Sequence, residues 1–314
     1  MATAISIKNW KLRLARIPRE DAYSIDETNK IIAAADGVTR DPMRYLADKK
    51  TLRGQIELAW YYPRPSPSAI VSKLFCQTFP EFLRQYKPEN RNEDAVAKSI
   101  AESNKLTHAW HRTNIPSPDY LTNDFAGCVA AVTSTYQDAV TLGFLTDAGV
   151  AIFHENGELK FRTENEGPDK FHDKIWEDPR LKNLVWEDPR ARAIIRCDYR
   201  NNPTEPNSFG VLTGENSAMH YVRTATQEIK PGEILVVYTD GLEKVIFSDE
   251  FAAALRTKSF LDINDLARTR VKTEGTLVYS VHAPQIEQAK TAGETDKLMQ
   301  LTIEQLARGE ELIN

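Results

Sequence analysis

Two short apolar runs, each followed by an aspartate and a glycine, constrain this sequence more than any other feature. The first, Ile31–Ala35, ends on Asp36-Gly37, and the second, Ile234–Tyr238, is followed after Thr239 by Asp240-Gly241. Asp-Gly between two strands is a common hairpin signal, but a helical pattern follows each pair here, so neither pair closes a hairpin. The repeat therefore predicts two buried strands that each deliver one carboxylate, as a metal site requires.

Length, charge and cysteine content exclude several classes of protein. The chain has 314 residues and a formal net charge of −5, without a basic stripe, so nothing indicates binding to nucleic acid. No run approaches the ~18 apolar residues of a membrane span, and Met1–Trp10 lacks the apolar core of a signal peptide. Cys76, Cys128 and Cys197 lie far apart, which favours reduced packing thiols. We expect a soluble cytoplasmic protein without nucleic-acid or membrane partners; its oligomeric state is not predicted.

Apolar periodicity predicts a mixture of helices and strands. Helices are expected from Asp41 toward Trp60, over Ile70–Leu83 with a break at Pro80, and around Val96–Trp110. From Gly127 the pattern becomes strand-like and predicts an antiparallel meander with a turn at Asn156-Gly157. The meander consists of the strands Cys128–Tyr136 and Ala139–Leu145, followed by the hairpin Gly149–Lys160. The other expected strands are Lys11–Arg16, Asp21–Ile25, Val211–Leu212, His220–Thr226, Glu233–Tyr238 and Thr276–His282, and the last helices are Phe247–Lys258 and Leu261–Thr269.

The polar segment Thr163–Pro206 contains the pentapeptide Trp-Glu-Asp-Pro-Arg twice, at Trp176–Arg180 and Trp186–Arg190. In each copy the Asp side chain suits a helix N-cap and the Pro suits the first helical position, which predicts two short helices. Two interpretations remain open, a surface insertion with two buried tryptophans and a mobile flap over a site. Elsewhere, His108 and His111 lie one helical turn apart, and we interpret them as exposed imidazoles because no third metal ligand is near.

No linker divides the chain. We therefore expect one domain over residues 1–284, with residues 163–206 as a flap or insertion. Residues 285–314 carry a weaker helical stripe and are expected to form a tail that packs on the body or recruits a partner. The stripe consists of Leu298, Leu301 and Leu306.

Five short motifs occur in a fixed order along the chain. They are Glu20-Asp21, Ala35–Val38, Ala126–Cys128, Leu145–Asp147 before Asn156–Glu158, and Ile229–Glu233 running into Tyr238–Leu242. In this order they resemble the motifs of the metal-dependent protein phosphatases. The chain is similar to the type 2C serine/threonine phosphatases, the PPM family, in their bacterial form, and the resemblance extends to about His282.

This resemblance implies both a fold and a set of metal ligands. The fold is α+β, a four-layer α-β-β-α sandwich in which two antiparallel sheets are flanked by helices. The cofactors are two Mn²⁺ or Mg²⁺ ions and a weaker third. In family terms Asp36 bridges the two ions, Gly37 offers its carbonyl oxygen, and Asp240 binds one ion. Glu20 acts through bound water, and Asp147 helps to hold the third ion.

The chemistry of phosphate hydrolysis fits these residue types. Hard divalent ions prefer carboxylate oxygens, and two ions ~3.5–4 Å apart activate a shared water as hydroxide, which attacks phosphorus directly without a serine or cysteine nucleophile. A phosphate also favours a guanidinium that grips two oxygens. Arg16, four residues before Glu20, occupies the position of the family's phosphate-binding arginine, and Arg13 and Arg19 are the alternatives.

The sequence departs from the family pattern at two positions. Val38 stands where many eukaryotic members have a histidine, so that candidate general acid is missing. Thr273, three residues before Thr276, stands where the family has its last metal-binding aspartate. A neutral hydroxyl is a poor ligand for a hard dication, and the adjacent Glu274 is a possible substitute.

We therefore predict a metal-dependent phosphomonoesterase, in particular a protein serine/threonine phosphatase whose partners are phosphoproteins. The alternative from another class is a catalytically weak pseudophosphatase that binds phosphoproteins or partners, an interpretation that Thr273 favours. A phosphatase for small phosphorylated metabolites is a further alternative, because Thr163–Pro206, which differs from the family, would determine substrate choice.

Overall fold

The computed structural model describes residues 2–8, 18–38, 56, 60, 62–115, 125–185, 188–271 and 274–283. The chain divides into two units, Met1–His282 and Ala283–Asn314, and every described helix and strand belongs to the first. The expected strand Lys11–Arg16 lies outside the described residues. The expected helix from Asp41 lies outside them too, apart from Ile56 and Trp60, which are helical.

Two five-stranded sheets, antiparallel throughout, form the centre of the first unit. In spatial order, the first sheet comprises β1 (Ala2–Lys8), β10 (Glu274–Val281), β9 (Ile234–Tyr238), β6 (Gly149–Phe153) and β7 (Leu159–Arg162). The second comprises β2 (Ala22–Asp26), β3 (Ile31–Val38), β4 (Gly127–Tyr136), β5 (Ala139–Phe144) and β8 (Arg223–Glu228).

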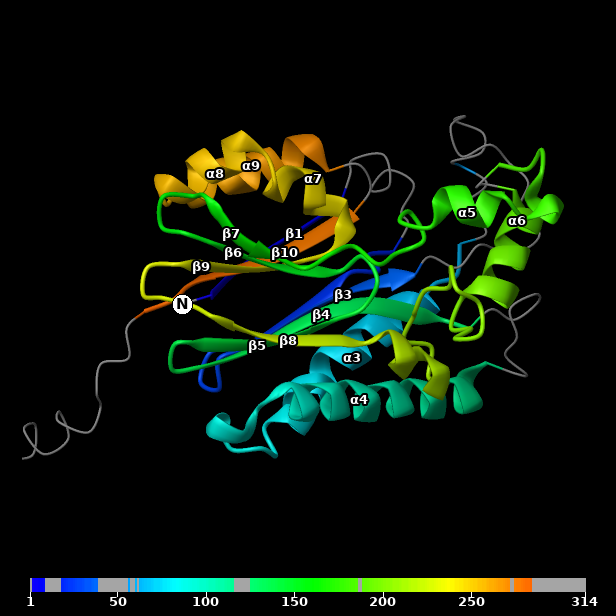
Figure 1. Ribbon diagram of the computed structural model, residues 1–314, viewed down its shortest axis with the longest axis horizontal. Helices are drawn as coiled ribbons and strands as arrows, with labels where there is room; N and C mark the ends of the chain where they lie inside the picture. The colour runs from blue at the N-terminus through cyan, green and yellow to red at the C-terminus, as the bar shows by residue number, and fades with distance from the viewer. Residues whose placement is uncertain are drawn as a thin grey trace, which may run out of the picture. The chain divides into compact units, whose positions relative to one another are not determined.

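Helices cover the outer face of each sheet (Figure 1). The second sheet is covered by α3 (Pro67–Leu83) and α4 (Glu93–Asn114), and the first by α7 (Glu243–Ile246), α8 (Asp249–Arg256) and α9 (Phe260–Arg270). The predicted four-layer α-β-β-α sandwich is therefore confirmed. No helix within the described ranges combines the length and apolar character needed to cross a membrane.

The continuous apolar runs of the sequence follow from burial on both faces of a strand. On β9, Leu235 and Val237 join the cluster that packs the two sheets together, whereas Val236 and Tyr238 join a second cluster beneath α7–α9. Because successive side chains of a strand point to opposite faces, a strand covered on both sides has no polar position.

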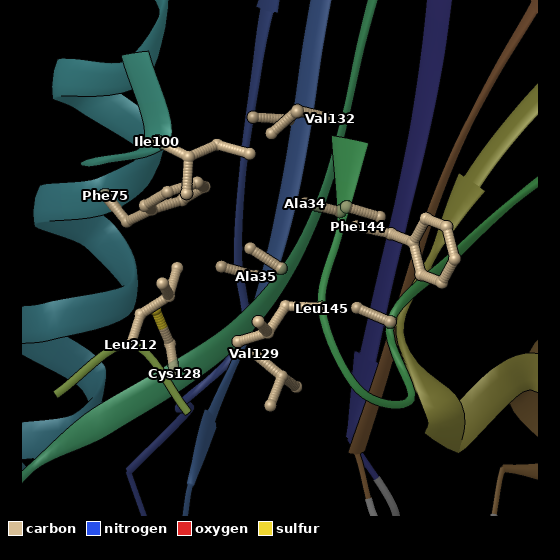
Figure 2. Close-up of a cluster of buried hydrophobic side chains, with 14 of the residues drawn as sticks. Ala34, Ala35, Phe75, Ile100, Cys128, Val129, Val132, Phe144, Leu145 and Leu212 are labelled. Carbon is tan, nitrogen blue, oxygen red and sulfur yellow. The ribbon is translucent and has the colours of Figure 1, made fainter. Parts of the chain in front are cut away.

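Strands β3, β4 and β5 of the second sheet are likewise buried on both faces. In Figure 2, Phe75 of α3 and Ile100 of α4 lie on the helix side of the sheet, near Val132, while Phe144 lies on the other side. Strand β3, between β2 and β4, carries three successive alanines, Ala33–Ala35, whose small side chains let α3 approach closely. The sheet thus holds β3 rigidly up to the point at which Asp36 and Gly37 occur.

Helix α3 begins before the predicted Ile70, ends at the predicted Leu83 and is continuous through Pro80. The hydroxyl oxygen of Ser66 accepts a hydrogen bond from the backbone N–H of Ala69, and Pro67 is the first helical residue. Pro80 does not split the helix, contrary to the prediction. Pro80 has no backbone N–H, so the helix lacks one hydrogen bond there. The fully buried side chains of Phe79 and Leu83 hold the last turn in place nonetheless.

The predicted meander is wrong in one respect, because its two hairpins belong to different sheets. Strands β4 and β5 pair in the second sheet, and β6 and β7 pair in the first, with the Asn156-Gly157 turn between them. The chain crosses from one sheet to the other through Leu145–Ala148. Asp147 therefore lies at a crossing between sheets and not in a hairpin turn.

Two further differences concern β1 and His111. Strand β1, at the edge of the first sheet, is absent from the sequence-based prediction. His111 is 1% exposed, and its ring packs against Trp110 and Phe125, so the prediction of an exposed imidazole is wrong for this residue. His108 is exposed, as predicted.

The segment from Thr163 to Pro206 forms α5 (His172–Trp176), a 3-10 turn (Pro179–Leu181), α6 (Pro189–Ile194) and a π-helical turn (Ile195–Tyr199). Asp178 and Asp188 cap the two predicted short helices through the N–H groups of Arg180 and Arg190. Trp176 is only partly buried, and Trp186 lies outside the described residues. Side chains that anchor the segment to the main core are Ile175, Leu181, Ala191 and Ile195.

Candidate functional site

Three aspartates from separate parts of the chain meet where β3 and β9 end. Asp36 is near the end of β3, Asp240 follows β9, and Asp21 directly precedes β2. The carboxyl group of Asp36 shares hydrogen bonds with those of Asp21 and Asp240. Asp36 is therefore the centre of a carboxyl cluster to which both sheets contribute.

Burial and mutual repulsion shift the titration of this cluster. Burial, together with the charges of Asp21, Asp240 and Asp147, raises the pKa of Asp36 well above its ordinary value. Burial also raises the pKa of Asp21 and of Asp240, although hydrogen bonds to Asp36 oppose the rise in both. Carboxyl groups held this close need a shared proton or a bound cation to remain together.

Asp147 lies beside this cluster at the crossing between the sheets. Burial, followed by the charge of Asp240, raises the pKa of Asp147 to about 8. Two further acidic groups, Asp169 of the inserted segment and Glu243 of α7, add negative potential around it. This side of the site is therefore acidic beyond the three central carboxyls.

Glu20 is fixed by the start of α3. Its carboxylate accepts a hydrogen bond from the Ser66 hydroxyl, and its backbone carbonyl accepts from the Ser72 hydroxyl and from the N–H of Gly37, the last at 3.2 Å. A Cβ on Gly37 would lie 2.8 Å from the Glu20 carbonyl oxygen and 2.9 Å from that of Ser68. Only glycine allows these backbone segments to approach so closely.

The second Asp-Gly pair has the same backbone requirement. A Cβ on Gly241 would lie 1.7 Å from the carbonyl oxygen of Glu274. Just before it, the hydroxyl of Thr239 donates to Asp21 Oδ2 at 2.8 Å and accepts from the N–H of Thr276 at 2.9 Å. Strands β9 and β10 thus fix the Asp21 side chain as well as Asp240.

The structure brings together most of the sequence-predicted residues that it describes. Asp36, Asp240 and Asp147 are close enough to shift one another's pKa, and Glu20 and Gly37 are joined through the backbone. Arg16, Arg13 and Thr273 lie outside the described residues. Arg19, the remaining candidate arginine, has a half-exposed side chain with Nε 3.9 Å from Glu274 Oε1.

The sequence-based prediction gave Asp21 no role of its own, yet its carboxyl is a direct neighbour of Asp36 and is only 4% exposed as a residue. Its signal was its place beside Glu20, immediately before a strand. Glu274, considered as a substitute ligand, instead accepts hydrogen bonds from the N–H groups of Glu20 and Asp21. Neither Asp21's contact with Asp36 nor these bonds follow from spacing along the chain.

The donor set fits a hard divalent cation. It consists of closely placed carboxyls with raised pKa values, beside two glycines at which the backbone approaches too closely for a side chain. Within the described ranges, however, no three acidic, histidine or cysteine side chains already have the arrangement of a metal-binding group. The carboxyl of Asp36 is instead hydrogen-bonded to that of Asp21 and to that of Asp240.

Comparison with known proteins shows which solved structures share this fold. No model of a protein family matches the sequence, and no curated protein matches it. Among solved structures, the serine/threonine phosphatase PstP/Ppp of Mycobacterium tuberculosis is similar, with a TM-score of 0.56 at 15% identity over 90% of this chain and 98% of that one. The PstP catalytic domain in complex with two manganese ions gives 0.57 at 14% identity, over 90% and 98% of the two chains.

A third similar structure is PppA, described as a key regulatory component of the T6SS in Pseudomonas aeruginosa. Its TM-score is 0.53 at 14% identity, and the match covers 90% of this chain and 97% of that one. The chain therefore has the fold of the bacterial type 2C serine/threonine phosphatases over 90% of its length.

Proposed function

We propose that this chain is a metal-dependent phosphomonoesterase of the type 2C family that removes phosphate from phosphoserine and phosphothreonine in proteins. One observation carries the proposal: Asp36 lies between Asp21 and Asp240 at the end of a sandwich shared with bacterial phosphatases. The manganese complex of one structural neighbour supports a metal cofactor at such a cluster.

In this proposal Asp36, Asp240 and Asp21, with the carbonyl oxygen of Gly37, would hold two Mn²⁺ or Mg²⁺ ions. Bound divalent cations supply Lewis acidity toward water and toward phosphoryl oxygen. Asp36 holds the central position and would contribute to both ions, while Asp147 would help to hold a weaker third. Glu20, whose carboxylate is oriented by Ser66, would act through an ordered water.

The protein residues have separate tasks in this site. Arg16, outside the described residues, would bind the phosphate of the substrate, because a guanidinium can donate to two phosphoryl oxygens at once. Thr239 and the backbone around Gly37 and Gly241 keep the carboxyls in place and leave no room for a side chain between the strands. The chain needs no serine or cysteine nucleophile for direct attack of water on phosphorus.

We extend the proposal to organisation and location. Residues 1–284 would be the phosphatase domain, with 163–206 as its flap or insertion, and residues 285–314 a helical tail; the unit boundary after His282 supports this division. A cytoplasmic location is supported by the cysteines, none of which forms a disulfide.

The test is hydrolysis by the purified full chain of p-nitrophenyl phosphate and of a phosphothreonine peptide, with Mn²⁺, with Mg²⁺ and with a chelator. We expect hydrolysis of both substrates that depends on the metal. Hydrolysis of small phosphates without activity on the peptide would change the substrate class. A folded chain that hydrolyses neither substrate at any metal concentration would contradict the proposal and favour a phosphoprotein-binding role.

A further inference from the structure

Glu274, the first residue of β10, directs its carboxylate at the backbone that precedes β2. Its Oε1 accepts hydrogen bonds from the N–H of Glu20 and the N–H of Asp21, each at 3.0 Å. Two successive N–H groups on one oxygen fix the orientation of the peptide between them, and with it the directions of the two side chains. The Glu274 side chain is 12% exposed, so these bonds are shielded from water.

Lys8, the cross-strand partner of Glu274 in the β1–β10 pair, completes this arrangement. Its ammonium lies 3.5 Å from Glu274 Oε2 and donates a hydrogen bond to the carbonyl of Pro18. The Lys8 side chain is 6% exposed. The edge strand β1 is therefore connected, through one buried ammonium, to both Glu274 and the segment that leads into Glu20.

The far end of Asp21 is held independently. While Glu274 binds the Asp21 backbone N–H, the Thr239 hydroxyl donates to its carboxyl at 2.8 Å, and that carboxyl also meets Asp36. A side chain held at both ends has few alternative rotamers, which is the property of a preorganised ligand.

We infer that Glu274, supported by Lys8, is a positioning residue that holds the Glu20–Asp21 turn in the geometry the metal site needs. The inference rests on the proposed function and assigns Glu274 a role other than replacing the family's last aspartate. Its Oε1 faces two N–H groups and its Oε2 faces an ammonium, so both oxygens already accept from protein donors. Glu274 thus acts through Glu20 and Asp21 and does not itself bind the metal.

Glu233 offers a matched control. Like Glu274, it has a largely buried side chain at the start of a strand of the first sheet. It accepts from a backbone N–H, that of Lys230, and from a lysine, Lys160. It also contacts His154. Glu233 precedes β9, whereas Asp240 follows it, so the two lie at opposite ends of that strand. Loss of Glu233 should reproduce the stability cost of losing a buried glutamate without affecting the carboxyl cluster.

The experiment measures binding of Mn²⁺ alone to the full chain by calorimetry, with thermal unfolding recorded for each variant. Glu274→Ala should raise the Mn²⁺ dissociation constant about tenfold or more, the usual range for a residue that orients a ligand. Glu274→Gln keeps an oxygen that can accept both N–H bonds, so we expect a change within about threefold. Glu233→Ala should lower the unfolding temperature and leave Mn²⁺ affinity within about twofold, because it is remote from the site.

Three results would overturn the inference. The first is an unchanged Mn²⁺ affinity in Glu274→Ala. The second is a loss of Mn²⁺ affinity in Glu233→Ala as large as that in Glu274→Ala. The third is an equally large loss in Glu274→Gln, which would mean that the charge of Glu274 itself binds the metal. If Glu274→Ala does not fold, Lys8→Met provides the second variant, and unchanged Mn²⁺ affinity in it would also contradict the role. Hydrolysis of p-nitrophenyl phosphate and of the phosphothreonine peptide by the wild type separates the two claims. An active wild type with unaffected variants refutes only the positioning role, and a wild type inactive on both substrates refutes the proposed function.

Discussion

Asp36 is the residue on which the carboxyl cluster depends, since its side chain contacts both Asp21 and Asp240. Asp21 and Asp36 come from neighbouring segments around β2 and β3, whereas Asp240 comes from the other sheet, and Asp36 is the group that is hydrogen-bonded to both others. Each neighbouring charge raises the pKa of Asp36. A change of charge at this one position therefore acts on the whole cluster.

We expect Asp36→Asn to reduce metal-dependent hydrolysis more than about 100-fold, because it removes the charge proposed to serve both ions. The amide has nearly the shape of the carboxyl, so the fold should persist, and removal of a repelling charge should not lower the free energy of unfolding without metal. Hydrolysis of p-nitrophenyl phosphate and thermal unfolding measure the two effects. Asp173→Asn, at a fully exposed position, is the control. Near-wild-type activity of Asp36→Asn with Mn²⁺ would refute the assignment.

The phosphate-binding arginine is the second prediction at this scale. Arg16→Ala should raise the KM for phosphorylated substrate by about tenfold or more while Mn²⁺ affinity changes little, since the guanidinium would contact substrate and not metal. Arg19→Ala is the matched variant, three residues further along and half exposed. Steady-state kinetics at saturating Mn²⁺ decide between them. An unchanged KM in Arg16→Ala with a raised KM in Arg19→Ala would transfer the role to Arg19.

The last turn of helix α4 contains a buried imidazole, that of His111, and this makes the stability of the protein depend on pH. Burial lowers the pKa of His111 to about 4 from its ordinary 6.5, and its ring packs between Trp110 and Phe125. Between these two values the unfolded chain binds a proton at this position and the folded chain does not. The contribution of neutral His111 to the free energy of unfolding is therefore complete above pH 6.5 and is lost as the pH falls toward 4.

We expect His111→Phe, which keeps an aromatic ring at this position, to remove that pH dependence. Relative to the variant, the wild type should lose roughly 3 kcal/mol of unfolding free energy between pH 6.5 and 4, the equivalent of the shift in pKa. Denaturant unfolding of both proteins at several pH values gives the difference, and His108→Phe, at an exposed position one turn earlier, controls for loss of an imidazole on this helix. A difference that is constant with pH would show that His111 is not neutral in the folded protein.

At the scale of elements, the strands that could be predicted are those buried on both faces. Ile31–Ala35 and Ile234–Tyr238 have unbroken apolar runs because helices and the facing sheet cover them. Strand β1 escaped prediction because it is an edge strand, and along Ala2–Lys8 only Ile5 and Lys8 are buried. The crossing at Leu145–Ala148 was not predicted. A short link between two strands has the same sequence pattern whether the strands belong to one sheet or to two.

The same distinction applies to the candidate site. Asp36 and Asp240 were predictable because each follows an apolar run, and a carboxylate at the end of a buried strand is unusual. The Glu274–Lys8 pair was not predictable. Its two residues face each other because β1 pairs with β10, and these strands lie at the two ends of the domain sequence. Contacts that depend on register over such separations leave no local pattern in sequence.

For the whole molecule, the important feature is that the carboxyl cluster joins the two sheets. Asp36 belongs to the second sheet and Asp240 follows a strand of the first, so mutual repulsion of the carboxyls acts against the packing of one sheet on the other. A cation bound between them would reverse the sign of this interaction. Metal binding should therefore be coupled to the stability of the complete sandwich and not only to local order at the site.

We expect Mn²⁺ to raise the unfolding temperature of the full chain in a concentration-dependent way. A ligand that binds only the folded state adds about 2.7 kcal/mol at a concentration 100 times its dissociation constant, which corresponds to roughly 5–10 °C per site for a domain of this size. Thermal scans over a Mn²⁺ titration, with sodium chloride at matched ionic strength as the control for screening, measure the effect. Asp36→Asn should lose most of the shift, because the variant retains the fold but lacks the central charge. An equal shift in Asp36→Asn and the wild type would mean that the stabilising metal binds elsewhere on the protein.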